Sequence, residues 1–446
     1  MPSVNRSLSS LLVAACIFGT ATWAGAQSER VLHSFNSGAY PQGGYGPSAG
    51  LVIDSAGNLY GTTQSGGTGS NPLCYAGDVE GCGVVFEVSP KPGGGWSERV
   101  LHNFGNGQDG YFTQSSLILD ADRDLYGTTM NGGTHGCGTL FELIPGAGRS
   151  WGEKILYNFC SKTNEADGQT PDSPLTFDAS GNLYGETLYG GPSGSGGGGG
   201  TVFELSRKAD GSWGEKVLYG FSGYFAAAGY GLTLDAAGNL YGVASGGVFN
   251  NGPCNFGCGL VFKLTPRSDG NSTSWTYKVL YEFYSNGDDG YQPNSPLLLD
   301  SSGDLYGTTF YGGIGPCDCG TVFELTPGSG GAWTEQILHS FVFNNVDGLF
   351  PEGLVADTAG NLYGTTQAGG AYSNDGYGTA FELMSQTDGS WTESILHNFG
   401  NETDGAYPVA GPIFDAYGNL YGTTYEGGAA GGGAGQAAGI VYAIKP

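Results

Sequence analysis

Short segments in which apolar and polar residues alternate recur along the chain from about residue 45 to its end. Each unit carries one phrase, Gly-Asn-Leu-Tyr-Gly-Thr-Thr in its commonest form, with a tyrosine at its centre. Seven such tyrosines are spaced about 60 residues apart: Tyr60, Tyr126, Tyr184, Tyr241, Tyr306, Tyr363 and Tyr421. A fixed period of this length predicts a repeat architecture rather than several unrelated domains.

Each repeating unit predicts four short strands separated by turn signals. In the fifth unit these strands are expected near 296–300, 305–309, 320–325 and 333–341, which are rich in β-branched and aromatic residues. The Asp-x-x-Gly-Asn turn between the first two strands supplies residues that accept positive φ. Because no helical period is present, four-stranded sheets repeated around an axis are expected, as in a β-propeller.

The two ends of the chain predict how the ring closes. A tryptophan opens the fourth strand in six units: Trp96, Trp151, Trp213, Trp275, Trp333 and Trp391. The last unit lacks its fourth strand, but residues 28–35 copy residues 97–104 almost position for position. We therefore expect an all-β, seven-bladed propeller with four antiparallel strands per blade, in which the N-terminal strand completes the last blade. Such closure leaves no sheet edge unpaired.

Residues 1–26 predict a secretory signal peptide. Arg6 precedes an apolar stretch, and the small residues Ala24 and Ala26 suit a cleavage site. Cys16 ends a run similar to a lipobox, but the residues after it stay apolar, so a lipoprotein is the less favoured alternative. No later stretch reaches the roughly 20 apolar residues of a membrane helix. We expect residues 27–446 to form one monomeric propeller domain, secreted or located at the cell surface or in the periplasm.

The full pattern of one unit is L-x-x-D-x-x-G-N-L-Y-G-T-T, a double glycine, G-T-V-F-E-L and W-x-E-x-x-L-H-x-F. Over residues 28 to 446 this pattern resembles the Gloeo/Verruco (GloVer) tandem repeat family of bacterial exported proteins. The resemblance implies a β-propeller of the cell surface or the extracellular space. It implies no known biochemical activity, because that family is defined by its repeat.

Composition narrows the class of partner. Glycine makes up 86 of 446 residues, yet aromatic residues reach 13%, which is too many for a disordered chain. Glycine therefore serves the turns of a folded protein. The formal net charge of −26 would repel a phosphate backbone, so we expect no nucleic acid partner.

Eight cysteines follow the predicted signal peptide, and all are expected on one face of the propeller. Their even number in an exported chain predicts four local disulfides: Cys74–Cys82, Cys137–Cys160, Cys254–Cys258 and Cys317–Cys319. The second of these pairs follows if Thr139 pairs near Asn158 in an antiparallel register. A thiolate metal site is the disfavoured alternative, because no C-x-x-C pair or histidine cluster stands nearby.

The same face is predicted to carry the ligand-binding residues, since variable loops on a fixed scaffold often hold function. Five units have Asp-Gly after the fourth strand, at Asp109, Asp167, Asp289, Asp347 and Asp404. We interpret these as Asx turns that fix the loops. The alternative is a ring of carboxylates for Ca²⁺ or a polar ligand. Three neighbouring tyrosines, Tyr111, Tyr291 and Tyr407, either stack on sugars or pack between blades, and the sequence favours neither interpretation.

No catalytic centre is predicted. Four histidines share a repeat position that holds tyrosine in other units, so aromatic packing explains them: His33, His102, His339 and His397. His135 alone lies off this pattern, and Ser48 lies in a G-x-S-x-G sequence without the helix that a nucleophile elbow needs. We therefore predict a non-catalytic binding or structural protein without a cofactor, whose disulfide-braced face binds a glycan or a surface protein. The alternative is a secreted carbohydrate-active hydrolase or lyase that uses acidic residues on that face.

Overall fold

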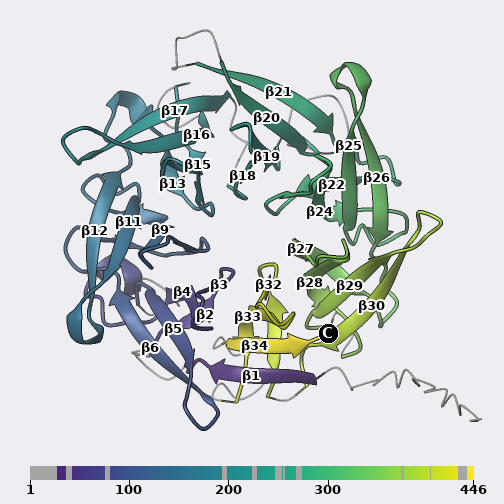
Figure 1. The fold of residues 1–446 in the computed structure, drawn as a ribbon, viewed down its shortest axis with the longest axis horizontal. Coiled ribbons are helices and arrows are strands. Elements are labelled where there is room, and N and C mark those ends of the chain that lie inside the picture. Colours follow the sequence, from purple (N-terminus) through teal and green to yellow (C-terminus); the bar gives the residue numbers. More distant parts are fainter. Residues whose placement is uncertain are drawn as a thin grey trace, which may run out of the picture.

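In the computed structural model, seven antiparallel sheets form the blades of a ring around a central channel (Figure 1). The structure describes residues 28–36, 43–75, 81–192, 198–222, 229–246, 254, 257–267, 274–372, 376–401, 403–429 and 439–446. Within these ranges the helices are four short 3₁₀ turns: η1 (Pro72–Tyr75), η2 (Ala147–Arg149), η3 (Thr163–Glu165) and η4 (Ser329–Gly331). The all-β, seven-bladed prediction is confirmed, while the predicted signal peptide lies outside the described residues.

The first four blades are given from the inside of the ring outward, and the innermost strand is often divided in two. The first blade contains β2 (Tyr45–Pro47), β3 (Val52–Ile53), β4 (Leu59–Ser65), β5 (Val84–Pro90) and β6 (Trp96–Asn103). The second contains β7 (Gly110–Tyr111), β8 (Ile118–Leu119), β9 (Leu125–Thr129), β10 (Asn131–Gly132), β11 (Thr139–Pro145) and β12 (Trp151–Asn158). The third contains β13 (Gln169–Pro171), β14 (Thr176–Phe177), β15 (Leu183–Tyr189), β16 (Gly198–Arg207) and β17 (Trp213–Ser222). The fourth contains β18 (Thr233–Leu234), β19 (Leu240–Ala244), β20 (Leu260–Pro266) and β21 (Trp275–Glu282).

The remaining three blades repeat this order. The fifth contains β22 (Gly290–Pro293), β23 (Leu298–Leu299), β24 (Leu305–Gly312), β25 (Thr321–Pro327) and β26 (Trp333–Ser340). The sixth contains β27 (Gly348–Ala356), β28 (Leu362–Gly369), β29 (Thr379–Ser385) and β30 (Trp391–Asn398). The seventh contains β31 (Gly405–Pro408), β32 (Ile413–Phe414), β33 (Leu420–Gly427), β34 (Ile440–Lys445) and β1 (Ser28–Ser34).

The ring closes through its two terminal strands. Strand β1 pairs antiparallel with β34, and Val31 lies opposite Tyr442 (Figure 1, purple beside yellow). The predicted closure is therefore confirmed, since the N-terminal strand is the outermost strand of the last blade.

The core is divided among the contacts between neighbouring blades. One buried cluster, for example, joins Tyr60 and Val85 of the first blade to Leu125 and Phe141 of the second. The third strand supplies one fully buried ring in every blade: Phe86, Phe141, Phe203, Phe262, Phe323, Phe381 and Tyr442. Each ring lies over the glycine of the Leu-Tyr-Gly phrase, and a Cβ on Gly61 would approach the Phe86 ring to 2.6 Å. The glycine recurs because the neighbouring strand's ring fills that space.

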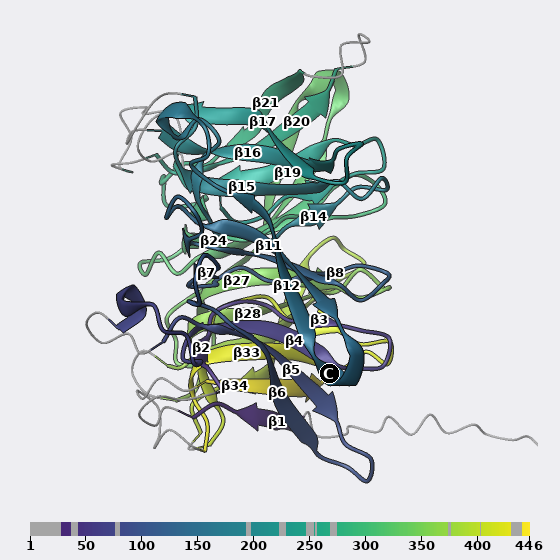
Figure 2. The same cartoon turned by 90° about the vertical axis from the view of Figure 1, so that its left-hand side faces the viewer.

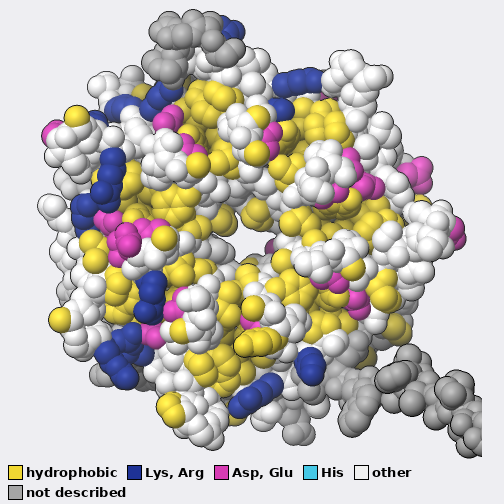
Figure 3. Space-filling model, in the orientation of Figure 1, with side chains coloured by type: hydrophobic (Ala, Val, Ile, Leu, Met, Phe, Trp, Pro, Cys, Tyr) yellow, Lys and Arg dark blue, Asp and Glu magenta, His cyan; other side chains and the backbone are white. Residues whose placement is uncertain are grey.

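The two faces of the ring are built differently (Figure 2). The turn face carries the Asp-x-x-Gly-Asn turns and the turns between third and fourth strands. In the first unit, the Asp54 carboxylate accepts hydrogen bonds from the backbone N–H groups of Ala56 and Asn58 and from the Tyr60 hydroxyl. The loop face carries the connections from second to third strands and from each blade to the next. Figure 3 looks onto the turn face, where Lys and Arg side chains lie over part of the ring and the fifth and sixth blades carry none.

Four disulfides tie down segments of the loop face. They are Cys74–Cys82, Cys137–Cys160, Cys254–Cys258 and Cys317–Cys319. These are the four pairs predicted from the sequence. The register that aligns the second pair is also present, because Thr139 lies opposite Asn158.

Candidate functional site

The five Asp-Gly aspartates lie at the loop face with their side chains turned into the protein. Their residues are between 0% and 8% exposed. Asp289 accepts a hydrogen bond from the backbone N–H of Tyr284, and Asp347 accepts one from that of Val342. Asp167 likewise accepts one from the backbone N–H of Ser161. These are the contacts of a loop anchor, in which a carboxylate satisfies the donors of its own turn.

Each of these carboxylates also meets a ring near the end of the preceding fourth strand. The Tyr157 hydroxyl donates to Asp167 Oδ2 over 2.8 Å, and the Tyr281 hydroxyl donates to Asp289 Oδ2 over 3.0 Å. Where histidine replaces tyrosine, His102 Nε2 lies 3.4 Å from Asp109 Oδ2. The tyrosine or histidine ring therefore lies between the loop and the next blade. This contact comes in addition to the aromatic packing of the strand that the sequence predicted.

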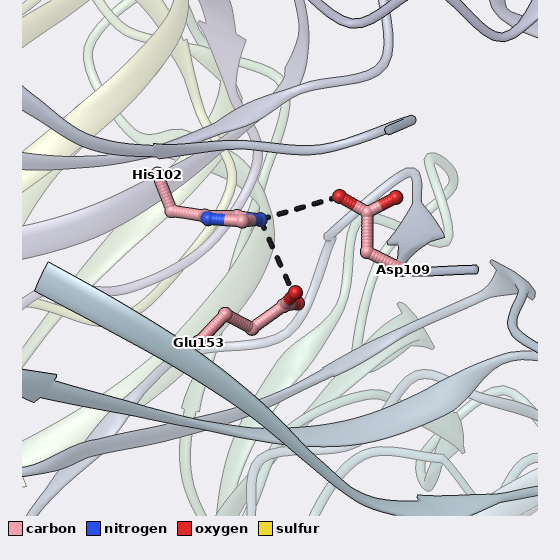
Figure 4. Close-up of side chains that lie close together, drawn as sticks. All are labelled: His102, Asp109 and Glu153. Atoms are coloured by element: carbon pink, nitrogen blue, oxygen red, sulfur yellow. Dashed lines mark ion pairs between the residues drawn. The ribbon is translucent and has the colours of Figure 1, made fainter. Parts of the chain in front are cut away.

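A glutamate from the next blade completes each group, and sequence reasoning did not single it out. Glu153 Oε1 lies 3.6 Å from His102 Nε2, so one side chain each from β6, the following loop and β12 converge (Figure 4). We call such a group of ring, aspartate and glutamate an interblade cluster. The signal in the sequence was the glutamate that stands two residues after the tryptophan in nearly every unit.

The interblade clusters differ in how they balance charge. Between the second and third blades, Lys162 forms an ion pair with the buried Glu215, beside Tyr157 and Asp167. Between the fourth and fifth blades, burial and the nearby Asp289 raise the pKa of Glu335 to about 7. Between the last and first blades, burial lowers the pKa of His33 to about 4 and raises that of Glu98 to about 7.

Two interblade clusters have a donor set that could hold a metal ion. In each, the atoms that could act as ligands all lie within 4.8 Å of one another: His102, Asp109 and Glu153, and His339, Asp347 and Glu393. Burial lowers the pKa of His339, but the carboxylates of Asp347 and Glu393 outweigh it and raise the pKa overall. Burial also raises the pKa of Glu393, although His339 opposes it. Both clusters thus place two carboxyl groups beside one imidazole.

The candidate tyrosines occupy different surroundings. Tyr111 is buried and packs edge to face on Phe112, whereas Tyr407 packs in the same way on Tyr377. Tyr291 stacks on Tyr311 with 5.5 Å between ring centres. The three tyrosines are thus not brought together, and Tyr291 is the one that joins a larger group of rings.

An aromatic patch covers the loop face of the fifth and sixth blades. Its half-buried members form one chain of ring contacts: Tyr291, Tyr311, Phe350 and Phe310. Exposed apolar side chains follow the neighbouring strands, at Tyr284, Ile314, Phe343, Val346 and Tyr372. Of the nine large apolar side chains exposed in the described residues, seven lie on the loop face and only Ile144 and Tyr417 on the turn face. Most of the exposed large apolar side chains of the described residues therefore lie on the loop face.

The central channel contains a second candidate site that sequence reasoning missed. One position of each blade lines a cavity of about 380 Å³: Ser48, Gln114, Asp172, Gly229, Asn294, Glu352 and Val409. These residues stand six positions before the turn aspartate, or five in the sixth unit, and no two are alike. A position that changes in every unit of an otherwise regular repeat was the available signal.

Acidic side chains in and beside this cavity are held away from water. Burial raises the pKa of Asp172 to about 7 and that of Glu186, behind the channel wall, to about 8. Glu352 accepts a hydrogen bond from Asn294 Nδ2 over 3.3 Å, and burial raises its pKa as well. The carboxyl groups of Asp172 and Glu186 can therefore exchange protons near neutral pH, a property common at functional sites.

Fold and surface together define a closed β-propeller whose loop face is braced by disulfides and carries an aromatic patch. The model of the Gloeobacter/Verrucomicrobia repeat matches the chain twice, over residues 17–253 and 193–436. The chain belongs to this repeat family, which confirms the resemblance seen in its sequence.

Solved structures of similar shape are distant in sequence, and no curated protein matches the chain. A gluconolactonase from Xanthomonas campestris is 14% identical, with 73% of this chain and 82% of that chain covered and a TM-score of 0.38. A luciferin-regenerating enzyme is 14% identical, with coverage of 93% and 95% and a TM-score of 0.41. A carbohydrate-active enzyme of family AA12 from Trichoderma reesei is 11% identical, with coverage of 95% and 96% and a TM-score of 0.38. Likenesses this distant say nothing about the activity of this chain.

None of the helices in the described part of the chain has the length and apolar character needed to span a membrane.

Proposed function

We propose that the protein is an exported, non-catalytic binding protein that holds a carbohydrate polymer on its loop face, over the fifth and sixth blades. The observation that carries the proposal is the aromatic patch around Tyr291, Tyr311, Phe310 and Phe350. An aromatic ring offers an apolar face and a polar rim, which suits the C–H faces of a sugar ring.

The surroundings of the patch add polarity and rigidity. Besides burial, the carboxylate of Asp318 contributes to the raised pKa of Tyr291, so an acceptor of sugar hydroxyls lies near the rings. Asp318 stands between the two halves of the Cys317–Cys319 disulfide, which fixes its backbone. A braced loop loses less conformational entropy when a ligand binds.

The disulfides also support a location outside the cytoplasm. Disulfides persist in oxidising compartments, so we propose that the monomer acts at the cell surface, in the periplasm or in the medium after residues 1–26 are removed. The binding requires no cofactor in this proposal.

Binding to a panel of soluble plant and microbial polysaccharides tests the function, by affinity electrophoresis or calorimetry. The double variant Tyr291→Ala and Tyr311→Ala is expected to lose at least about tenfold in affinity, or about 1.4 kcal/mol. Tyr417→Ala is the matched control, because Tyr417 is 91% exposed on the turn face and should leave affinity unchanged. Measurements with added Ca²⁺ and with EDTA test whether the Asp-Gly loops contribute a Ca²⁺ site.

Two outcomes would reject the binding proposal. In the first, no polysaccharide binds, or the control loses as much affinity as the patch variant. In the second, new reducing or unsaturated ends appear and Asp172→Asn abolishes them. That outcome would favour the alternative, a hydrolase or lyase, whose strongest support is the proton-exchanging carboxyl group of Asp172 in the channel cavity.

A further inference from the structure

The interblade clusters that contain histidine are built like ligand sets rather than like ordinary hydrogen-bond networks. His102 Nε2 lies 3.4 Å from Asp109 and 3.6 Å from Glu153, and these side chains point toward one another (Figure 4). The second cluster repeats this geometry, since His339 Nε2 lies 3.4 Å from Asp347 and 3.7 Å from Glu393. Two separate interfaces thus hold the same atoms at the same spacing.

Each of the two clusters contains buried side-chain atoms that lack hydrogen-bond partners. In the described residues, no hydrogen bond reaches His102 Nε2, Asp109 Oδ1 or Glu153 Oε1, nor the corresponding three atoms of the second cluster. The side chain of Asp109 is only 4% exposed and that of Asp347 only 5%. Buried polar atoms without partners cost free energy, and an ion bound among them would lower that cost.

Charge leads to the same requirement. Each cluster places two carboxyl groups beside one imidazole, so negative charge remains there unless a carboxyl group keeps its proton or a further cation joins. Between the second and third blades the cation is Lys162, which pairs with Glu215. At the two histidine clusters no lysine or arginine of the described chain forms an ion pair with either carboxylate.

Equivalent positions with tyrosine show what a simple hydrogen-bonded cluster looks like in this chain. There the hydroxyl of Tyr157 or Tyr281 approaches its aspartate to 2.8 or 3.0 Å. The distances of 3.4 to 3.7 Å at His102 and His339 exceed the usual range for such a bond. They match the separation, about 3.4 Å, of two ligand atoms that each bind one tetrahedral metal ion at about 2.1 Å.

We propose that two divalent transition-metal ions of the Zn²⁺ class bind to this propeller, one at His102, Asp109 and Glu153 and the other at His339, Asp347 and Glu393. One imidazole nitrogen and two carboxylates suit such an ion, whereas Ca²⁺ takes oxygen ligands alone. Water fills the fourth position, because the histidines and glutamates are each about one fifth exposed. The ions clamp the first blade to the second and the fifth blade to the sixth.

The third histidine of this type does not form a site. His397 Nε2 lies 3.0 Å from Asp404 Oδ2, which is a direct hydrogen bond. It therefore serves as the internal control, because it has the same residue type and the same place in the repeat.

Metal content of the purified full chain tests the proposal. The protein is stripped with a chelator, dialysed, loaded with Zn²⁺ or Co²⁺ and passed through gel filtration before elemental analysis. The expected result is two tightly bound ions per chain, visible absorption bands for bound Co²⁺, and a melting temperature that rises with metal, as ligand linkage requires.

Substitution by the chain's own alternative residue locates the ions. His102→Tyr and His339→Tyr keep an aromatic ring that can bond the aspartate, as Tyr157 and Tyr281 do, so folding should be preserved. Each variant should lose one ion per chain, and the double variant should lose both ions and the metal-dependent rise in melting temperature. His397→Tyr should still bind two ions.

Three results would overturn the proposal. They are a wild-type chain that binds no stoichiometric metal, a double variant that binds as much metal as the wild type, or a His397→Tyr variant that loses an ion. Polysaccharide binding is measured separately on the same variants, so failure of the metal sites is distinguishable from failure of the proposed function.

Discussion

The interface between the second and third blades and the interface between the fourth and fifth blades use the same two acidic positions but balance them differently. In the first, Lys162 neutralises Glu215 beside Asp167. In the second, no described cation pairs with Glu335 or Asp289, and burial raises the pKa of Glu335 to about 7. A proton held by a carboxyl group thus takes the place of a lysine.

The repeat thus determines where the two acidic side chains lie at an interface between blades, but not how their charge is balanced. Five of the seven interfaces have both the aspartate and the glutamate of the blade pattern, and each must then balance their charge in its own way. Lysine, a retained proton and, as we propose, a metal ion are three solutions to one problem, because two unpaired carboxylates cannot be buried together cheaply.

Among the substitutions at these two interfaces, the loss of Lys162 is expected to lower the free energy of unfolding most. Lys162→Met leaves the fully buried Glu215 side chain unpaired next to the buried Asp167. We expect a loss of about 3 kcal/mol in the free energy of unfolding, since a broken buried ion pair leaves one charge uncompensated. Urea unfolding at pH 7 measures this value.

Lys154→Met is the control on the turn face. Its partner Glu142 keeps a hydrogen bond from Tyr126 and an ion pair with Arg207, so a loss below about 1 kcal/mol is expected. Equal losses in the two variants would contradict the role given to Lys162.

Replacing Glu335 by glutamine is expected to change how the free energy of unfolding depends on pH. In the folded state the pKa of Glu335 is about 7, whereas in the unfolded chain the pKa of this carboxyl group is its ordinary value of 4.5. The stability contributed by this group is therefore complete below pH 4.5 and is lost as the pH rises toward 7. Glu335→Gln should gain about 1–2 kcal/mol over the wild type between pH 4.5 and pH 8, after allowance for partial exposure.

Denaturant midpoints of the Glu335→Gln variant and of the wild type, each measured at pH 4.5 and at pH 8, give this difference in stability. A variant that follows the wild-type pH dependence throughout would show that Glu335 is ionised in the folded protein.

The smallest effect concerns the ring that both interfaces share. Tyr157→Phe removes one hydrogen bond to Asp167, which keeps those from the Ser161 backbone and hydroxyl. We expect a loss of about 1 kcal/mol. Tyr219→Phe should cost almost nothing, because Tyr219 stacks on Tyr277 with 4.1 Å between ring centres and keeps that stack. Thermal unfolding of the two variants in parallel tests the difference, and equal shifts would argue against a role for the Tyr157 hydroxyl.

The sequence predicted those features that are repeated or local. The copy of residues 97–104 at residues 28–35 was enough to predict that β1 closes the ring, and loop spacing was enough for three of the disulfides. Contacts between blades could not be predicted in this way. Whether Lys162 reaches Glu215 depends on how far one blade is rotated against the next, and no periodicity records that angle.

The channel residues were missed for the opposite reason. Asp172, Asn294 and Glu352 stand at one position of the repeat, but they share no chemistry that a pattern search would recognise. The Asp-Gly aspartates were found because they repeat, and they accept hydrogen bonds from their own loops. A position that changes in every unit of a regular repeat is therefore a second place to look for function, beside the positions that repeat.

The pairing of β1 with β34 also affects the order in which the strands pair during folding. Strand β1 lies at the start of the described chain, and its partner β34 lies more than four hundred residues later. The first of the described strands to be made is therefore the last to be paired. Contacts of such long separation slow folding, and until they form, the edges of β1 and β34 offer templates for another chain. The last blade can therefore be completed only after β34 has been made, and an incomplete chain would be exposed to misassembly at its unpaired strand.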